Sequence, residues 1–253
     1  MVQTRQTDAV VLNCLEHGES DIIVTLFCQD VGRLSAIAKG AKKSQKRFVN
    51  KLELFSFLHI SYQQKAHRSL AFLIEAELHT AFLQLRHDLQ LYSIASVIRE
   101  FLLQAIRENE PDPAIFRLLL WALHNLDRQQ PPLTVLCMTL IRLYAHLGYR
   151  PDLTTCAQCN SSVNSRSQYS FDTTSGRIIC STCNPHRAKG IALSHGTIKI
   201  LRTIQDQPVE RLHRLKMSGS ILYEAVSLLQ SYGNQLLQRD IVSWKMARKF
   251  LKK

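Results

Sequence analysis

Residues 21–39 read DIIVTLFCQDVGRLSAIAK, and they decide the fold of the N-terminal third of the chain. The stretch holds two short runs rich in apolar and β-branched residues, 21–28 and 34–39, with Gly32 in the turn that separates them. Runs of this length, bounded by turn residues, are typical of β-strands. We therefore predict two neighbouring strands here.

Three further strand-like runs flank this pair, at 7–15, 54–62 and 70–78. In the last run the glutamates alternate with an apolar set that we expect to share one face: Leu70, Phe72, Ile74, Ala76 and Leu78. Five short strands predict a small barrel or sandwich, although strand number alone does not specify the topology. A five-stranded barrel that binds a nucleic-acid strand across one face is the oligonucleotide-binding (OB) fold, and any other small β-barrel is the competing interpretation for residues 1–80.

After residue 81 the pattern becomes helical, because apolar side chains recur every three or four residues. Asp88 is a candidate N-cap of the first helix, and Asp112 followed by Pro113 begins the second. Gly148 stands where the residue after the end of the third helix belongs. More helices are predicted further along, and the chain ends in a basic amphipathic segment.

Four cysteines form two C-x-x-C pairs, Cys156 with Cys159 and Cys180 with Cys183, and 20 residues separate the pairs. This spacing is typical of a four-thiolate zinc site, because each turn brings two thiolates to one ion and the second pair closes the tetrahedron. Such a Zn²⁺ is structural, since four protein ligands leave no open position. His186 is an alternative fourth ligand, and disulfides or unrelated thiols are the competing interpretations.

Together these patterns predict an α+β multidomain protein. A five-stranded β-barrel at 1–80 is followed by an α-helical domain at 81–253, which a zinc-ribbon-like module with the four cysteines interrupts at about 154–190.

Several classes of enzyme are excluded by motif. No two of the nine glycines are closer than six positions, so neither a dinucleotide-binding G-x-G-x-x-G nor a P-loop is present. His17 and Glu19 match half of the nucleobase-deaminase signature, but no proline precedes either cysteine pair. The histidines have no partner at metalloprotease spacing, and we interpret those in strand-like runs, His59 and His79, as structural. We expect no catalytic activity.

The longest stretch without a charged residue is 14 residues, 225–238, and half of it is polar. A membrane-spanning helix needs about 18 or more apolar residues, and the N-terminus has no apolar signal region. We therefore expect a soluble cytoplasmic protein with no membrane partner.

The net charge of +12 is unevenly spread. Residues 156–253 carry 15 basic and 5 acidic side chains, and the 13 residues from Lys39 to Lys51 carry six basic and no acidic ones. A run of this kind attracts polyphosphate backbones, whereas the competing interpretation is a basic loop that only improves solubility.

The segments that carry these features resemble the RecO family of bacterial recombination mediators. The resemblance is carried by G-E-S-D at 18–21, T-L-F at 25–27, G-R-L at 32–34, A-I-A-K-G-A-K-K at 36–43, L-E-L-F at 52–55, L-G-Y at 147–149 and P-D-L at 151–153, and weakly by 243–251. Departures are Leu54 in place of proline, a variant basic loop at 44–47 and a less glycine-rich turn at 173–176.

The resemblance implies an OB-fold domain, a helical body and a zinc-ribbon-like insertion. It also implies a role in DNA repair and recombination: annealing of complementary strands and, with RecR, loading of RecA onto DNA coated by single-stranded-DNA-binding protein (SSB). The family recognises the acidic, apolar C-terminal tail of SSB through the helical domain. Single-stranded DNA is the expected ligand, double-stranded DNA is left open, and the bacterial cytoplasm or nucleoid is the expected location.

Annealing requires contacts that neutralise phosphates and leave base edges free, which lysine and arginine provide. We predict phosphate contacts from Arg33, Lys39, Lys42, Lys43, Lys46, Arg47 and Lys51. Phe48 interrupts the basic run and is predicted either to stack on a base or to be a core aromatic. Seven cations of the C-terminal third are candidates for a second DNA surface or for binding an acidic tail: Arg187, Lys189, Lys199, Arg202, Arg211, Arg214 and Lys216. The alternative function is a zinc-ribbon RNA-binding or transcription-associated factor.

Overall fold

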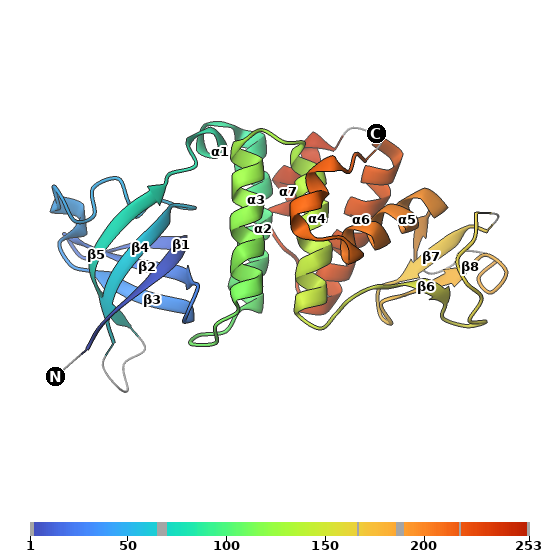
Figure 1. Ribbon diagram of the computed structural model, residues 1–253, viewed down its shortest axis with the longest axis horizontal. Coiled ribbons are helices and arrows are strands. Elements are labelled where there is room, and N and C mark those ends of the chain that lie inside the picture. The colour runs from blue at the N-terminus through green and yellow to red at the C-terminus, as the bar shows by residue number, and fades with distance from the viewer. Residues whose placement is uncertain (1–2, 65–69, 166, 186–189, 218, 252–253) are drawn as a thin grey trace.

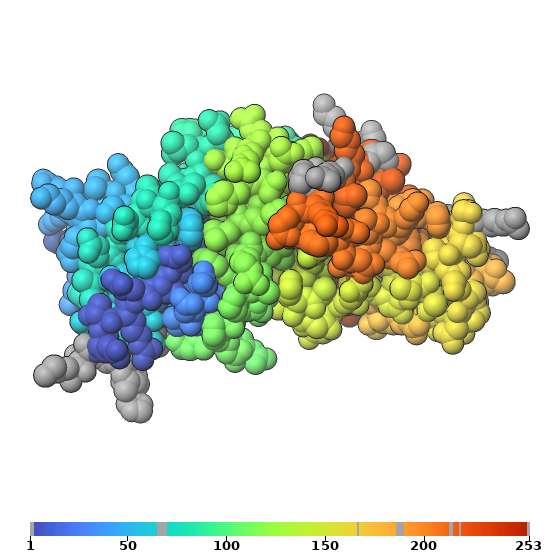
Figure 2. Space-filling model, in the orientation of Figure 1, coloured from blue at the N-terminus to red at the C-terminus, as the bar shows by residue number. Residues whose placement is uncertain are grey.

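The computed structural model describes residues 3–64, 70–165, 167–185, 190–217 and 219–251. Three parts follow one another along its long axis: a β-barrel, a body of helices and a small β-sheet (Figure 1). The space-filling view shows the same succession, with the helices packed between the other two parts (Figure 2). The predicted α+β class, with a barrel followed by helices and a cysteine-bearing insertion, is confirmed.

The barrel is closed, and its strand order is β1-β2-β3-β5-β4. Neighbouring strands are antiparallel except for the parallel pair of β3 and β5. A five-stranded barrel of this kind is the OB fold predicted from the sequence. Its strands are β1 (Thr4–His17), β2 (Asp21–Cys28), β3 (Gly32–Ala38), β4 (Phe57–Gln63) and β5 (Ala71–Thr80).

One face of β1 packs on the helices. The run from Ala9 to Leu12 is apolar without alternation and wholly buried, as expected for a strand covered on both sides. Ala9 and Val11 contribute to the barrel interior, whereas Val10 and Leu12 belong to the core shared with the helices. The register shifts between Val11 and Asn13, and such a bulge re-aims the side chains that follow it.

The predicted apolar face of β5 is wrong at both ends: of Phe72, Ile74, Ala76 and Leu78 only Ala76 is buried, and Leu78 is exposed. Ser61 pairs with Glu75 and Tyr62 with Leu73, which leaves Ile74 as the extra residue of a β-bulge. A bulge reverses the alternation, so Leu73 is buried in the barrel whereas Phe72 is only partly buried on the outer surface. The bulge leaves no signature in the composition of the strand.

The helical body begins as predicted. Asp88 caps its helix by accepting a hydrogen bond from the Leu91 N–H at 2.9 Å. Asp112 accepts from the N–H groups of two residues in the first turn of the next helix. Gly148 takes φ +84°, and the hydrogen bond from the Tyr149 N–H to the Tyr144 carbonyl completes a Schellman end. These three predictions are confirmed.

The α-helices are α1 (Leu83–His87), α2 (Leu89–Ala105), α3 (Pro113–Asp127), α4 (Pro132–His146), α5 (His195–Asp206), α6 (Gly219–Leu237) and α7 (Trp244–Ala247). Short 3-10 helices span Ala41–Lys43, Val209–Arg214 and Arg248–Phe250. Within the described residues, no helix is long and apolar enough to cross a membrane.

A small sheet between α4 and α5 carries the cysteines. Its strand order is β6-β8-β7-β9, and its strands are β6 (Asp152–Cys156), β7 (Tyr169–Asp172), β8 (Arg177–Cys180) and β9 (Ile191–Leu193). The sheet is attached to the helices through aromatic packing, because the Phe171 ring meets the Tyr232 ring of α6 edge-on at 5.2 Å. The sheet is therefore joined to the helical core and not only tethered to it.

The barrel and the helices meet at a close backbone contact. Gly32, which begins β3, has φ +79°, and a Cβ there would lie 2.1 Å from the Glu110 carbonyl oxygen. Arg33 binds the same loop through its backbone: its N–H donates to the Arg107 carbonyl and its carbonyl accepts from the Asn109 N–H. We call this contact of residues 32–33 with residues 107–110 the barrel–helix seam.

Candidate nucleic-acid interface and cysteine cluster

The basic run lies in the connection between β3 and β4, which we call the basic loop (residues 39–56). Irregular structure predominates in it, and hydrogen bonds to the turn between β1 and β2 hold its start. Asp21 accepts from the Gly40 N–H at 2.8 Å and from the Ser20 hydroxyl at 2.9 Å. The Lys42 N–H donates to the Ser20 carbonyl at 2.9 Å. The G-E-S-D and A-K-G-A-K-K segments are therefore two halves of one supporting unit.

Three of the six cations in the basic loop are occupied by the protein itself. Lys42 Nζ pairs with Glu16 at 2.7 Å and also donates to the Gly18 carbonyl at 3.2 Å. Arg47 donates to two backbone carbonyls and places its guanidinium 5.1 Å from the Phe48 ring centroid. Lys51 Nζ donates to the Ala76 carbonyl at 2.7 Å and to the Lys46 carbonyl at 2.9 Å. The Lys42 contacts hold the loop against the β1–β2 hairpin, and those of Arg47 and Lys51 hold it against β5.

The other three cations point outwards. Lys39, Lys43 and Lys46 are exposed, and within the described residues no hydrogen bond or ion pair involves their side-chain nitrogens. Lys39 Nζ lies 6.0 Å from the centroid of the Phe72 ring. We call this set the free lysines. Their charge is available to a ligand, because no carboxylate among the described residues pairs with it.

Arg33 lies elsewhere. Its Nη1 donates to the Leu103 carbonyl at 2.9 Å, and Nη2 lies 3.7 Å from a Glu108 carboxylate oxygen. The guanidinium thus belongs to the barrel–helix seam and not to the basic loop. This geometry does not support the prediction that Arg33 contacts phosphate, because its donors already bind the helical body.

Phe48 is a core residue. Only 3% of it is exposed, and it packs inside the barrel with Leu52 and other apolar side chains. Of the two interpretations offered by the sequence, the core interpretation is confirmed and stacking on a base is not supported. Phe72, which the sequence assigned to the interior, is the aromatic ring that lies beside a free lysine on the outer surface. The signal that would have identified it is the bulge at Ile74, which only the strand pairing reveals.

The four cysteines converge as their spacing predicts. Cys156 and Cys180 end β6 and β8, and the turns after these strands bring Cys159 and Cys183 back toward them. The four Sγ atoms lie within 4.8 Å of one another, and those of Cys159 and Cys180 are 3.8 Å apart. A tetrahedral ion with Zn–S bonds of about 2.3 Å spaces its sulfurs by about 3.8 Å, so the geometry fits a metal of this type.

Hydrogen bonds favour the thiolate form of two of the four cysteines, Cys156 and Cys159, whereas the neighbouring Cys180 and Cys159 thiols raise the pKa of Cys183 to about 12. Burial alone would raise the pKa of the Cys156 thiol, but hydrogen bonds from the N–H groups of Cys159, Cys180 and Gln158 lower this pKa to about 6. Cys159 has a lowered pKa chiefly because of the Ser161 hydroxyl, which lies 3.0 Å from its sulfur. Metal ions bind the thiolate form, so such contacts favour binding. His186, the alternative ligand, lies outside the described residues.

The described candidates among the cations of the C-terminal third lie on two successive segments of the chain. Lys199 and Arg202 lie on α5, whereas Arg211 and Lys216 follow it in a separate segment. Arg187 and Lys189 lie outside the described residues, as does the side chain of Arg214. Lys216 lines a cavity of about 280 Å³ between α3, α4 and residues 212–217, with Trp121, Met138, Leu212 and Leu215.

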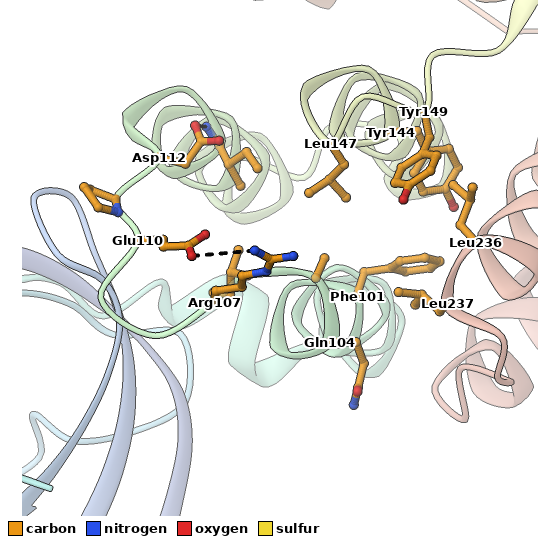
Figure 3. Close-up of a pocket in the computed structure, with 14 residues that line it drawn as sticks. Phe101, Gln104, Arg107, Glu110, Asp112, Tyr144, Leu147, Tyr149, Leu236 and Leu237 are labelled. Atoms are coloured by element: carbon orange, nitrogen blue, oxygen red, sulfur yellow. Dashed lines mark hydrogen bonds and ion pairs between the residues drawn. The ribbon is translucent and has the colours of Figure 1, made fainter. Parts of the chain in front are cut away.

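A second cavity, of about 460 Å³, opens where α2, α4 and α6 end and α3 begins (Figure 3). At its rim Arg107 and Glu110 form an ion pair at 3.6 Å, and Asp112 caps α3. Leu147, Leu236 and Leu237 contribute apolar lining. Because its charged groups are already paired or capping, this cavity offers no surplus charge to a nucleic acid.

Comparison with known proteins agrees with this architecture. The family model for the N terminal part of recombination protein O matches residues 1–82, and the model for its C terminal part matches residues 86–245. The chain belongs to the RecO family. RecO membership places it among proteins of DNA repair and recombination, and the resemblance found in the sequence is confirmed.

Similar curated proteins support the assignment to RecO along nearly the whole chain. DNA repair protein RecO of Syntrophus aciditrophicus is 31% identical over 245 residues, which cover 96% of this chain and 95% of the relative. RecO of Syntrophobacter fumaroxidans is 33% identical over 215 residues, 85% of each chain. RecO of Desulfatibacillum aliphaticivorans is 34% identical over 230 residues, 89% of each chain.

Proposed function

We propose that this RecO protein is a DNA-binding recombination mediator that anneals complementary single strands. With RecR, it helps load RecA onto single-stranded DNA coated by SSB. The observation that carries the proposal is the basic loop on a closed OB-type barrel. Three lysines whose ammonium groups have no hydrogen bond or ion pair among the described residues stand there on a scaffold that three other cations and Asp21 hold in place.

The free lysines are proposed as the phosphate contacts. Contacts to phosphate carry no sequence information, and each one releases counterions from the strand. Annealing needs this combination, because repulsion between strands falls while the base edges stay accessible for pairing. In the same proposal Lys42, Arg47 and Lys51 act chiefly by shaping the loop, since their donors bind carbonyl or carboxylate oxygens of the barrel.

Phe72 is proposed as the ring on which a base stacks. It lies on the outer surface of the barrel beside Lys39, and a stacked base adds about 1–3 kcal/mol of binding free energy without base preference. Lys39 would contact the phosphate, and Phe72 the base, of the same nucleotide. The aromatic contact and the charge then work together.

The cysteine cluster is proposed to hold a structural Zn²⁺ through Cys156, Cys159, Cys180 and Cys183. Its chemistry is restricted to cross-linking, because four thiolates fill the coordination sphere. It joins the ends of β6 and β8 and so stabilises the sheet that packs on α6. We propose no direct contact between this metal and DNA.

The acidic, apolar tail of SSB is proposed to bind the cavity that Lys216 lines. The walls of this cavity are largely apolar and Lys216 at its edge is exposed, which matches the chemistry of such a tail. The paired charges of the cavity in Figure 3 make it the weaker candidate. Replacing Lys216 with glutamate should weaken binding of an SSB tail peptide and leave binding of bare single-stranded DNA unchanged.

Annealing of complementary oligonucleotides coated with the cognate SSB tests the proposal as a whole. We expect the protein to accelerate annealing, and we expect the acceleration to depend on the SSB tail. The alternative, a zinc-ribbon RNA-binding or transcription-associated factor, predicts tighter binding to RNA than to DNA and no annealing. Tight binding of single strands without acceleration would favour that alternative.

A further inference from the structure

An imidazole–carboxylate cluster lies on the outer face of the barrel, on the three adjacent strands β1, β4 and β5. His59 Nδ1 lies 2.8 Å from Asp8 Oδ1, and His79 Nε2 lies 3.4 Å from the same oxygen. One nitrogen from each ring and one carboxylate oxygen are all within 4.8 Å of one another. We call Asp8, His59 and His79 the barrel triad.

Strand register explains why the three side chains meet. Asp8 is the direct partner of His59 across β1 and β4, and direct partners point to the same face of a sheet. His79 is the extra residue of a bulge in β5, where Phe57 pairs with Thr80 and Leu58 with Leu78. A bulge re-aims its extra side chain, and here it directs the His79 ring toward the other two.

We propose that the barrel triad binds a divalent transition-metal ion of the Zn²⁺ type. Two imidazoles and one carboxylate form a donor set that such ions favour, and water completes the coordination of a site on the surface. With metal–ligand bonds of about 2.0–2.1 Å, neighbouring donors lie about 2.9 Å apart in octahedral and about 3.4 Å apart in tetrahedral geometry. The observed separations of 2.8 and 3.4 Å span the range between these two geometries, so small shifts of the side chains bring the three donors to one ion.

The surroundings of the barrel triad fit this role. The Phe57 ring packs against His79 with 4.8 Å between ring centroids, which restricts the orientation of that imidazole. Glu77 is the direct partner of His59 on β5, so its carboxylate lies on the same face and adds negative charge near the site. Each triad side chain is about one-third to two-fifths exposed, so an ion reaches the site without opening the barrel.

DNA binding does not account for this cluster. Asp8, Glu77 and the nearby Glu75 carry negative charge, which repels phosphate, and no cation described in the basic loop is paired with the triad. A bound ion would link β1, β4 and β5 on a surface whose charge is opposite to that of the free lysines. It would therefore stabilise the barrel and leave the phosphate contacts unoccupied.

Calorimetric titration with Zn²⁺ tests the site on the intact chain, first loaded with zinc and freed of excess metal by gel filtration. We expect about one further equivalent to bind. His59→Ala, His79→Ala and Asp8→Asn should each abolish it, whereas His87→Ala, at an exposed histidine that ends α1, should retain it. The Cys156→Ser chain should also retain it, which separates this site from the cysteine cluster.

Absence of the further equivalent, or its survival in both His59→Ala and His79→Ala, would overturn the proposal. Circular dichroism of each variant shows whether the barrel is folded. A second measurement needs no variant: substoichiometric paramagnetic Co²⁺ should broaden the ring resonances of His59 and His79 before those of the other histidines. Broadening distributed evenly over all ten histidines would also overturn it.

Discussion

The barrel–helix seam gives a quantitative prediction for Gly32→Ala. Gly32 has φ +79°, a conformation that costs about 1–2 kcal/mol for a residue with a Cβ. The new Cβ would also lie 2.1 Å from the Glu110 carbonyl oxygen, so the seam must open by about 1 Å to reach ordinary contact. Opening breaks the two backbone hydrogen bonds of Arg33, which contribute about 1 kcal/mol each.

The sum is a loss of about 3–4 kcal/mol in the free energy of unfolding. For a chain of this size, a loss of that order lowers the melting temperature by roughly 10 °C. Thermal unfolding followed by circular dichroism and calorimetry measures it. We expect the substitution to act by separating the barrel from the helices, so that the calorimetric transition broadens or splits.

Gly18→Ala is the matched control. Gly18 has φ +59° in the same barrel, but nothing lies within 4 Å of a Cβ placed there. It should therefore lose only the conformational part, about 1–2 kcal/mol. Equal losses in Gly32→Ala and Gly18→Ala would refute the reasoning, because the overlap with Glu110 would then contribute nothing.

Three other perturbations test separate parts of the account. Cys156→Ser should remove the zinc equivalent that the cysteine cluster holds and lower thermal stability before DNA binding changes. Full stability in a metal-free wild-type chain, found by elemental analysis, would contradict a structural ion. The pKa of Asp21 lies below its usual value, chiefly because the Gly40 N–H donates a hydrogen bond to the Asp21 carboxylate. The ionised carboxylate therefore stabilises the basic loop at neutral pH, and this stabilisation is lost as the pH falls through the lowered pKa. Hydrogen exchange of the Gly40 amide should therefore accelerate in Asp21→Ala at pH 7, and an unchanged rate would show that the contact does not hold the loop. Phe72→Ala should weaken single-stranded DNA binding by about 1–3 kcal/mol and leave stability unchanged. Phe48→Ala should instead lower the free energy of unfolding by about 3–5 kcal/mol. Weaker DNA binding at unchanged stability in Phe48→Ala, and not in Phe72→Ala, would identify Phe48 as the stacking residue.

Local signals in the sequence predicted much of the fold. Asp88, Asp112 and Gly148 act within one helical turn, so residue type and position sufficed to place these helix ends. The cysteine spacing predicted the convergence of the four thiols. Each C-x-x-C turn brings its own two thiols together, and tetrahedral coordination of one ion requires the two pairs to meet.

Features that depend on strand pairing could not be predicted. The bulge at Ile74 places Phe72 outside the barrel, although strict alternation placed it inside. Arg33 stood in a recognisable motif, but only the folded chain shows that its guanidinium binds the α2 end and the loop after it. Counting charges could not separate Lys42, which pairs with Glu16, from Lys43, which has no partner among the described residues.

The salt dependence of single-stranded DNA binding tests the central claim most directly. Replacing Lys39, Lys43 and Lys46 with alanine should reduce the slope of log K against log salt by about 2, since each lost contact to a single strand removes about 0.7. The matched control replaces three exposed cations outside the barrel, Arg117, Lys245 and Lys249, and removes the same charge. We expect a nearly unchanged slope in the control. An unchanged slope in the loop variant, or an equal reduction in both, would contradict the assignment of phosphate binding to the free lysines.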